Sequence, residues 1–84
     1  MKAVMKFANA NGSERTVTFD TDAHTFSSSD GRTGAYARNG ATLTMKVEGH
    51  DLPVTLGKEL SSPGDTTTFN GPEGNGTATL IAIT

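Results

Sequence analysis

The stretch from Ala35 to Leu56 most constrains what this chain can form, because it carries a strict two-residue alternation. Leu43, Met45 and Val47 alternate with threonines and charged residues, as expected of a strand with one face in a core and the other in water. Asn39–Gly40 precedes this run, and Asn-Gly is the strongest short-range signal for a hairpin turn of type I′. The stretch therefore predicts antiparallel strands joined by tight turns.

A second strand follows within the same stretch. After a turn expected at residues 49–51, the alternation resumes with Leu52, Val54 and Leu56 on the core side. Pro53 lies among them and has no backbone N–H to donate to a neighbouring strand. We therefore expect this strand either at the edge of a sheet or paired on one side only at Pro53.

Composition and length place these strands in one small domain. A chain of 84 residues has room for a single core, so residues 1–84 are expected to form one domain. Fourteen threonines and ten glycines suit pleated strands and tight turns, and a net charge of -2 is too small to favour disorder. We expect an all-β fold, a small single-domain barrel or two-layer sandwich of about seven to eight short, mainly antiparallel strands.

The other expected strands show weaker patterns. A polar loop is expected over residues 28–34, and the apolar run Leu80–Ile83 predicts a strand that is buried on both faces. The remaining strands are expected at residues 2–8, 15–20, 24–27, 66–70 and 77–84.

Catalytic and metal sites have simpler explanations in this sequence. Asp20, Asp22 and His24 have a spacing that could put three metal ligands on one face of a strand, but an Asp-Thr-Asp segment is more often a turn in which the aspartates bond their own backbone. The pair His50–Asp51 lacks a positioned serine and a Gly-x-Ser-x-Gly elbow. We therefore expect no catalytic residue, no metal and no cofactor, and interpret the protein as not an enzyme.

The charge balance also disfavours nucleic acid as a partner. The chain has seven lysines and arginines against nine aspartates and glutamates, and four of the five aromatic residues are phenylalanines expected in the core.

Cysteine is absent, so neither a disulfide nor a thiolate metal site can form. The N-terminus has no signal-peptide pattern, and no apolar stretch of the sequence is long enough for a membrane helix. The expected compartment is the cytoplasm, of a cell or of an infected host, and a processed secreted form stays open.

The segment Arg32–Arg38 is the best candidate for a binding site. It sets the only tyrosine, Tyr36, between two arginines beside small residues, and tyrosine and arginine are the residues that most often anchor protein interfaces. The predicted binding residues are Arg32, Tyr36, Arg38 and, on the following turn, His50. The alternative is that Tyr36 packs in the core with its hydroxyl at the rim.

Residues 33–40, Thr-Gly-Ala-Tyr-Ala-Arg-Asn-Gly, resemble the Ser-Gly-Ala-Arg-Tyr stretch of the small β-barrel inhibitors of C-type lysozyme. In this chain the tyrosine is displaced and the cysteines of that family are missing. The resemblance implies a barrel that docks on a protein.

These observations together predict a non-catalytic protein-binding module, in its most concrete form a small stand-alone inhibitor of host or phage origin. The alternative is a structural subunit of a virion or shell that self-associates through an exposed edge strand, which makes a homo-oligomer a second expected assembly. A barrel that binds single-stranded nucleic acid is the third hypothesis.

Overall fold

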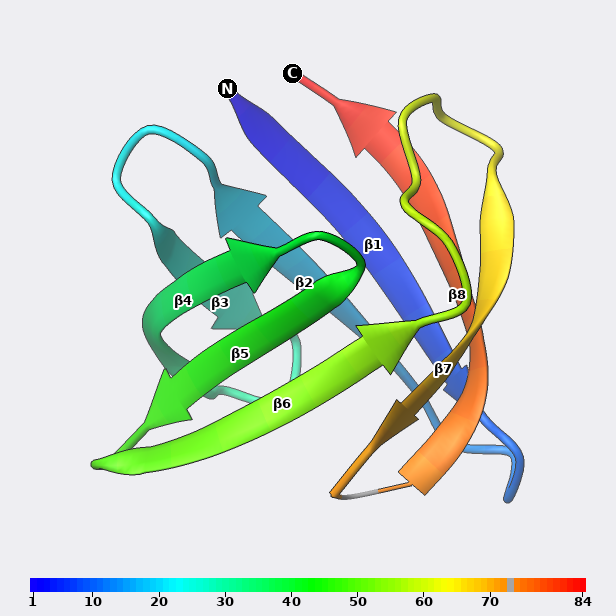
Figure 1. Ribbon diagram of the computed structural model, residues 1–84, viewed down its shortest axis with the longest axis horizontal. Coiled ribbons are helices and arrows are strands. Elements are labelled where there is room, and N and C mark those ends of the chain that lie inside the picture. Colours follow the sequence, from blue (N-terminus) through cyan, green and yellow to red (C-terminus); the bar gives the residue numbers. More distant parts are fainter. Residues whose placement is uncertain (73) are drawn as a thin grey trace.

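The computed structural model describes residues 1–72 and 74–84, and in this part of the chain eight antiparallel strands close into a barrel (Figure 1). Each strand pairs with the next one along the chain, and the last pairs with the first. The all-β prediction is confirmed, and the barrel is the form taken. The strands are β1 (Lys2–Asn9), β2 (Glu14–Asp20), β3 (Thr25–Ser28), β4 (Thr33–Asn39), β5 (Thr42–Val47), β6 (His50–Leu56), β7 (Thr66–Gly71) and β8 (Gly74–Ile83).

The predicted β4–β5 hairpin forms, but its turn lies one residue later than expected. Asn39 pairs with Thr42, so the two turn residues are Gly40 and Ala41. Of these two turn residues, only Gly40 has a positive φ, which is 60°. A positive φ at the first turn position alone fits type II′, which takes glycine there, so the predicted type I′ turn at Asn39–Gly40 is wrong.

A type I′ turn occurs instead between β5 and β6. Val47 pairs with His50, and the two residues between them, Glu48 and Gly49, have φ values of 50° and 82°. Two positive φ values define this turn type. The turn expected at residues 49–51 is therefore shorter, and His50 and Asp51 belong to β6. Similarly, the loop expected over residues 28–34 ends earlier, because β4 begins at Thr33.

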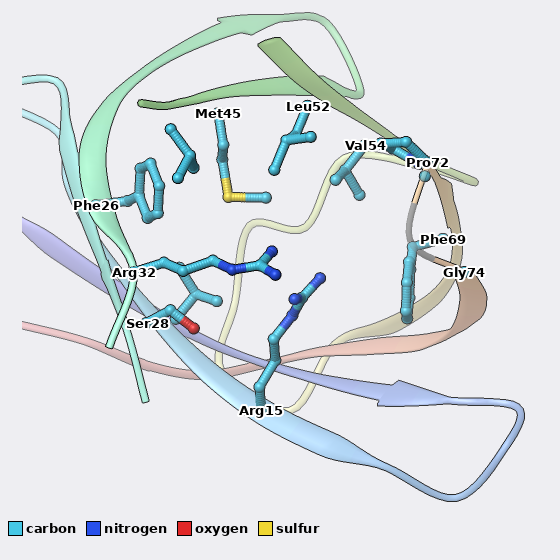
Figure 2. Close-up of a pocket in the computed structure, with 13 residues that line it drawn as sticks. Arg15, Phe26, Ser28, Arg32, Met45, Leu52, Val54, Phe69, Pro72 and Gly74 are labelled. Atoms are coloured by element: carbon cyan, nitrogen blue, oxygen red, sulfur yellow. The ribbon is translucent and has the colours of Figure 1, made fainter. Parts of the chain in front are cut away.

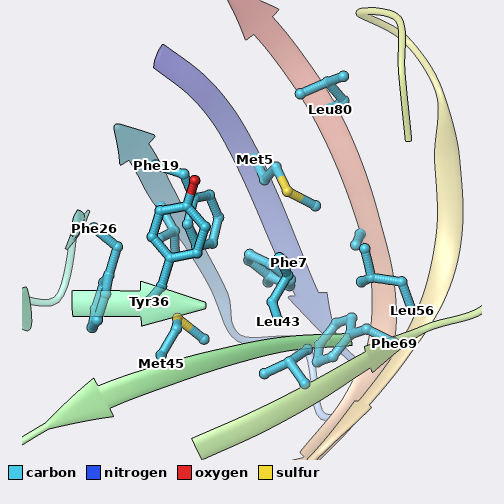
Figure 3. Close-up of a cluster of buried hydrophobic side chains, with 13 residues drawn as sticks. Met5, Phe7, Phe19, Phe26, Tyr36, Leu43, Met45, Leu56, Phe69 and Leu80 are labelled. Carbon is cyan, nitrogen blue, oxygen red and sulfur yellow. The ribbon is translucent and has the colours of Figure 1, made fainter. Parts of the chain in front are cut away.

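The alternating residues meet in one core inside the barrel (Figure 3). Aromatic rings pack edge to face within it: the ring centroids of Phe7 and Phe69 lie 5.2 Å apart and those of Phe19 and Tyr36 lie 4.9 Å apart. Edge-to-face packing suits the ring quadrupoles. The buried apolar residues are Met5, Phe7, Val17, Phe19, Phe26, Tyr36, Leu43, Met45, Val54, Leu56, Phe69, Ala78 and Leu80.

The apolar run near the C-terminus is explained by a register shift. Val4 pairs with Ala82 but Met5 pairs with Leu80, which leaves Ile81 as an extra residue on β8. Such a β-bulge resets the alternation. Leu80 and Ile83 both contact the core, whereas Ile81 is 46% exposed. The prediction that β8 is buried on both faces is therefore wrong at Ile81.

The seam between β6 and β7 is the least extensively paired in the barrel. Thr55 pairs with Asn70 and Leu56 with Phe69, whereas Pro53 pairs only with Thr44 of β5 among the described residues. The one-sided pairing predicted for Pro53 is confirmed. The ladder closes elsewhere, but residues 50–54 of β6 have no partner on β7 among the described residues and form an unpaired strand edge.

The up-and-down topology sorts the connections into two ends of the barrel (Figure 1). The terminus end carries both chain termini and the segments 21–24, 40–41 and 57–65, and the opposite end carries the other turns. These two ends therefore provide the two openings into the core.

Within residues 1–72 and 74–84 the structure contains no helix that is long and apolar enough to cross a membrane.

Gly76 tests how closely the strands approach one another at the closure of the barrel. A Cβ atom at Gly76 would lie 1.9 Å from the carbonyl oxygen of Ala8 on β1. We predict that Gly76→Ala lowers the free energy of unfolding by about 2 to 3 kcal/mol in urea denaturation followed by circular dichroism. Gly49→Asn is the matched control, because Gly49 has open space around it and a φ of 82° in a type I′ turn, which asparagine tolerates. Equal effects of the two substitutions would contradict this account of closure.

Candidate functional site

A pocket of about 260 Å³ opens at the terminus end of the barrel. Its floor and walls are mostly apolar, with the buried residues Met5, Leu43 and Leu80 among them. Small residues at the mouth, Ala3 and Gly40, leave space where larger side chains would fill the barrel. The terminus end is therefore hollow, although the middle of the barrel is packed.

Tyr36 of β4 brings a phenol hydroxyl group to this pocket. The residue is only 9% exposed and its ring packs against Phe19. Figure 3 shows its oxygen pointing away from Phe26 and Met45. The hydroxyl makes no hydrogen bond with any residue in the described part of the chain. Burial raises the pKa of Tyr36, while the Arg38 charge lowers it by a smaller amount, so the phenol keeps its proton at neutral pH.

Arg38 lies two residues further along β4, on the same face of the strand as Tyr36 and nearer the mouth of the pocket. Its Nη2 atom lies 3.1 Å from Oε1 of Glu59, and its Nε donates a hydrogen bond to the carbonyl of Gly40. Arg38 and Glu59 are the residues with charged side chains among those that line this pocket, and Met1, which carries the N-terminal ammonium group, lines it as well. Both are more than half exposed, so the ion pair is screened by water.

The segment 57–65, which joins β6 to β7, forms one side of the mouth through Glu59, Leu60 and Ser61. Leu60 packs against the core. The segment is fastened to β8, because Gly64 donates to the carbonyl of Leu80 and Leu80 donates to that of Asp65. The mouth is thus bordered by strand β4 on one side and, on the other, by the irregular segment 57–65, whose end is attached to β8.

Asp65 holds the middle of this segment in place. Its carboxylate accepts hydrogen bonds from the backbone N–H groups of Ser62 and Ser61, at 3.1 and 3.3 Å. These two bonds favour the ionised form and lower the pKa of Asp65.

The opposite end of the barrel is filled. Figure 2 shows Arg15 and Arg32 reaching toward one another over the apolar side chains of Phe26 and Met45. Oδ2 of Asp30 lies 3.6 Å from Nη1 of Arg15 and 3.7 Å from Nε of Arg32. Both arginines make further interactions. The space left between these side chains is about 20 Å³, room for roughly one water molecule.

The residues predicted as one binding site are divided between the two ends. Tyr36 and Arg38 line the pocket at the terminus end, whereas Arg32 lies at the opposite end and His50 is exposed at the start of β6. Tyr36 is buried, as in the alternative drawn from the sequence. The contribution of Glu59 went unrecognised, because nothing in the local pattern of residues 57–65 relates this segment to β4.

The Asp20–His24 region forms a turn. The carboxylate of Asp20 accepts hydrogen bonds from the N–H groups of Asp22 and Ala23, both at 3.1 Å, and Asp22 pairs with the N-terminal ammonium group. The described residues contain no group of three potential ligands placed to hold a metal ion. The Asp20 carboxylate thus bonds to nearby backbone, as the turn interpretation predicts, whereas the Asp22 carboxylate bonds to the N-terminus instead.

Substitutions at Tyr36 should separate its ring from its hydroxyl. Tyr36→Ala removes a buried ring and is expected to cost about 3 to 5 kcal/mol of unfolding free energy. Tyr36→Phe removes only the hydroxyl, which has no hydrogen-bond partner to lose, and is expected to stay within about 0.5 kcal/mol of the wild type or to be more stable. A large loss in Tyr36→Phe, measured by thermal and urea unfolding, would show that the hydroxyl is bonded within the fold.

The Asp65 carboxylate predicts an acid-dependent opening of the segment 57–65. Its native pKa lies below the unfolded value of 3.8, so its stabilising effect is present above that pH and is lost as the pH falls through the native pKa. We expect amide hydrogen exchange at Ser61 and Ser62 to accelerate in this range, and Asp65→Asn to remove the pH dependence. Asp51→Asn, which neutralises an exposed carboxylate on β6, should retain it; the same profile in both variants would contradict the assignment.

Comparison with protein-family models, with curated proteins and with solved structures gave no match to this chain. The resemblance of residues 33–40 to the inhibitors of C-type lysozyme therefore gains no support from them. What the protein binds has to be argued from the geometry of its own residues.

Proposed function

We propose that this barrel is a non-catalytic binding module that holds one small, largely apolar molecule in the pocket at its terminus end. The observation that carries the proposal is an apolar pocket of about 260 Å³ lined by Tyr36, whose hydroxyl, at the end of a buried ring, has no partner among the described residues. Ligand sites are concave and mostly apolar, with a few polar groups that fix orientation. The pocket has this composition.

The pocket volume sets the size of the molecule. A dry cavity of about 150 Å³ accommodates benzene. By proportion, 260 Å³ suits roughly ten non-hydrogen atoms, the size of an eight-carbon chain with a polar end group.

The barrel architecture supports the same conclusion. An eight-stranded barrel is just wide enough for its side chains to fill it or for one small ligand to lie inside. Here the opposite end is filled by arginine and apolar side chains, whereas the terminus end is open. Histidine and cysteine are absent from the described lining of the pocket, and the charged side chains in it, those of Arg38 and Glu59, pair with each other, which is why we propose binding and not catalysis.

Protein docking through Arg32, Tyr36, Arg38 and His50 stays a prediction. We rank it below ligand binding, because one partner surface would have to reach both ends of the barrel and Tyr36 offers little exposed area. Self-association through an edge strand also stays a prediction. Closure of the ladder limits it to parts of strand edges, such as residues 50–54 of β6, that have no second partner among the described residues.

The methionines offer a direct test, because they report on both ends of the barrel. Met5 lines the pocket at the terminus end and Met45 lines the narrow space at the opposite end. We predict that octanol, titrated into the protein, shifts the methyl NMR signal of Met5 to saturation and leaves that of Met45 nearly unchanged, because only the terminus end has room for it.

A pocket-filling variant provides the control. Ala3→Leu places extra carbon atoms in the mouth and should abolish the Met5 shift while keeping or raising stability. Val47→Leu adds one carbon atom at the opposite end and should leave octanol binding intact. Equal shifts at Met5 and Met45, or octanol binding that survives Ala3→Leu, would refute the proposal.

A further inference from the structure

The mouth of the pocket presents two hydrogen-bond donors on one strand. The phenol of Tyr36 keeps its proton and has no partner in the described part of the chain, and the guanidinium of Arg38 lies two residues away on the same face of β4. Two donors side by side at the open end of an apolar pocket suit an acceptor group that is attached to an apolar body.

We propose that the molecule bound is a monocarboxylic acid with an apolar tail, whose carboxylate takes the place of Glu59 on Arg38 and accepts a hydrogen bond from Tyr36 while the tail fills the pocket. This inference rests on the proposed function. It names the ligand class and gives Arg38 and Glu59 opposite effects on affinity.

The structure favours an anionic ligand over a cationic one. An ammonium group would have to bind Glu59, which lies on the irregular segment 57–65. Arg38, in contrast, lies in β4, where its backbone pairs with Leu43 of β5. Preorganised donors lose less entropy when they bind. Tyr36 adds a second hydrogen-bond donor beside Arg38. Arg38 is therefore better placed than Glu59 to bind a charged ligand.

Glu59 occupies the position that the ligand carboxylate would take. Its Oε1 lies 3.1 Å from Nη2 of Arg38, a charge-assisted contact of the kind that an arginine makes with any carboxylate. A bound acid must therefore displace Glu59, and this competition weakens its binding. Removing the charge of Glu59 should strengthen the binding of an acid but leave the binding of a neutral molecule of equal length unchanged.

The experiment compares octanoate with octanol, using the Met5 methyl signal to measure both dissociation constants. Because the Arg38 site is partly exposed, we expect octanoate to bind at least about threefold more tightly than octanol. Arg38→Gln should abolish this preference, and Glu59→Gln should increase it by about threefold. Arg32→Gln is the matched control, because it removes an arginine from the opposite end and should leave the preference unchanged.

The outcomes separate this inference from the proposed function. If octanol binds as tightly as octanoate in the wild type, or if the preference survives Arg38→Gln, the carboxylate inference is wrong and the pocket still binds apolar molecules. If neither molecule shifts the Met5 signal, both the inference and the proposed function are wrong. If Arg32→Gln removes the preference as well, the effect comes from overall charge, and the assignment to Arg38 fails.

Discussion

The pairing of β1 with β8 is the interaction on which the rest of the structure depends. It joins the two ends of the chain over residues 3–9 and 76–83 and turns a row of hairpins into a closed ladder. Closure removes most of the free strand edges and, in the described part of the chain, gives thirteen buried apolar side chains a shared interior without a disulfide or a helix. Gly76 permits the close approach of the strands, and the bulge at Ile81 lets Leu80 and Ile83 both face inward.

The local features of this fold could be predicted from the sequence, whereas its closure could not. Alternation identified the strands and most of the core, because a two-residue period is a property of each strand alone. The turn at Gly40 and the bulge at Ile81 depend on the register between strands, and register is set by contacts with a neighbour. The prediction therefore placed one turn a residue too early and missed the outward position of Ile81.

The candidate site divides in the same way. Tyr36 and Arg38 stood out because their residue types are those that bind, and their common face follows from their spacing along one strand. The sequence could not show that Arg32 lies at the other end of the barrel or that Glu59 faces Arg38. Both facts arise from the up-and-down topology, which sends successive connections to alternate ends. Arginine side chains fill one end, whereas Ala3 and Gly40 leave space among larger apolar side chains at the other.

The central claim is that the terminus end of the barrel contains an apolar space that a guest can enter. Xenon tests this most directly, because it occupies apolar cavities without needing any polar contact. In crystals of the protein held under xenon pressure, the account predicts xenon density between Met5, Leu43 and Leu80 and none near Arg15. Absence of xenon at the terminus end, with the barrel intact, would contradict the account.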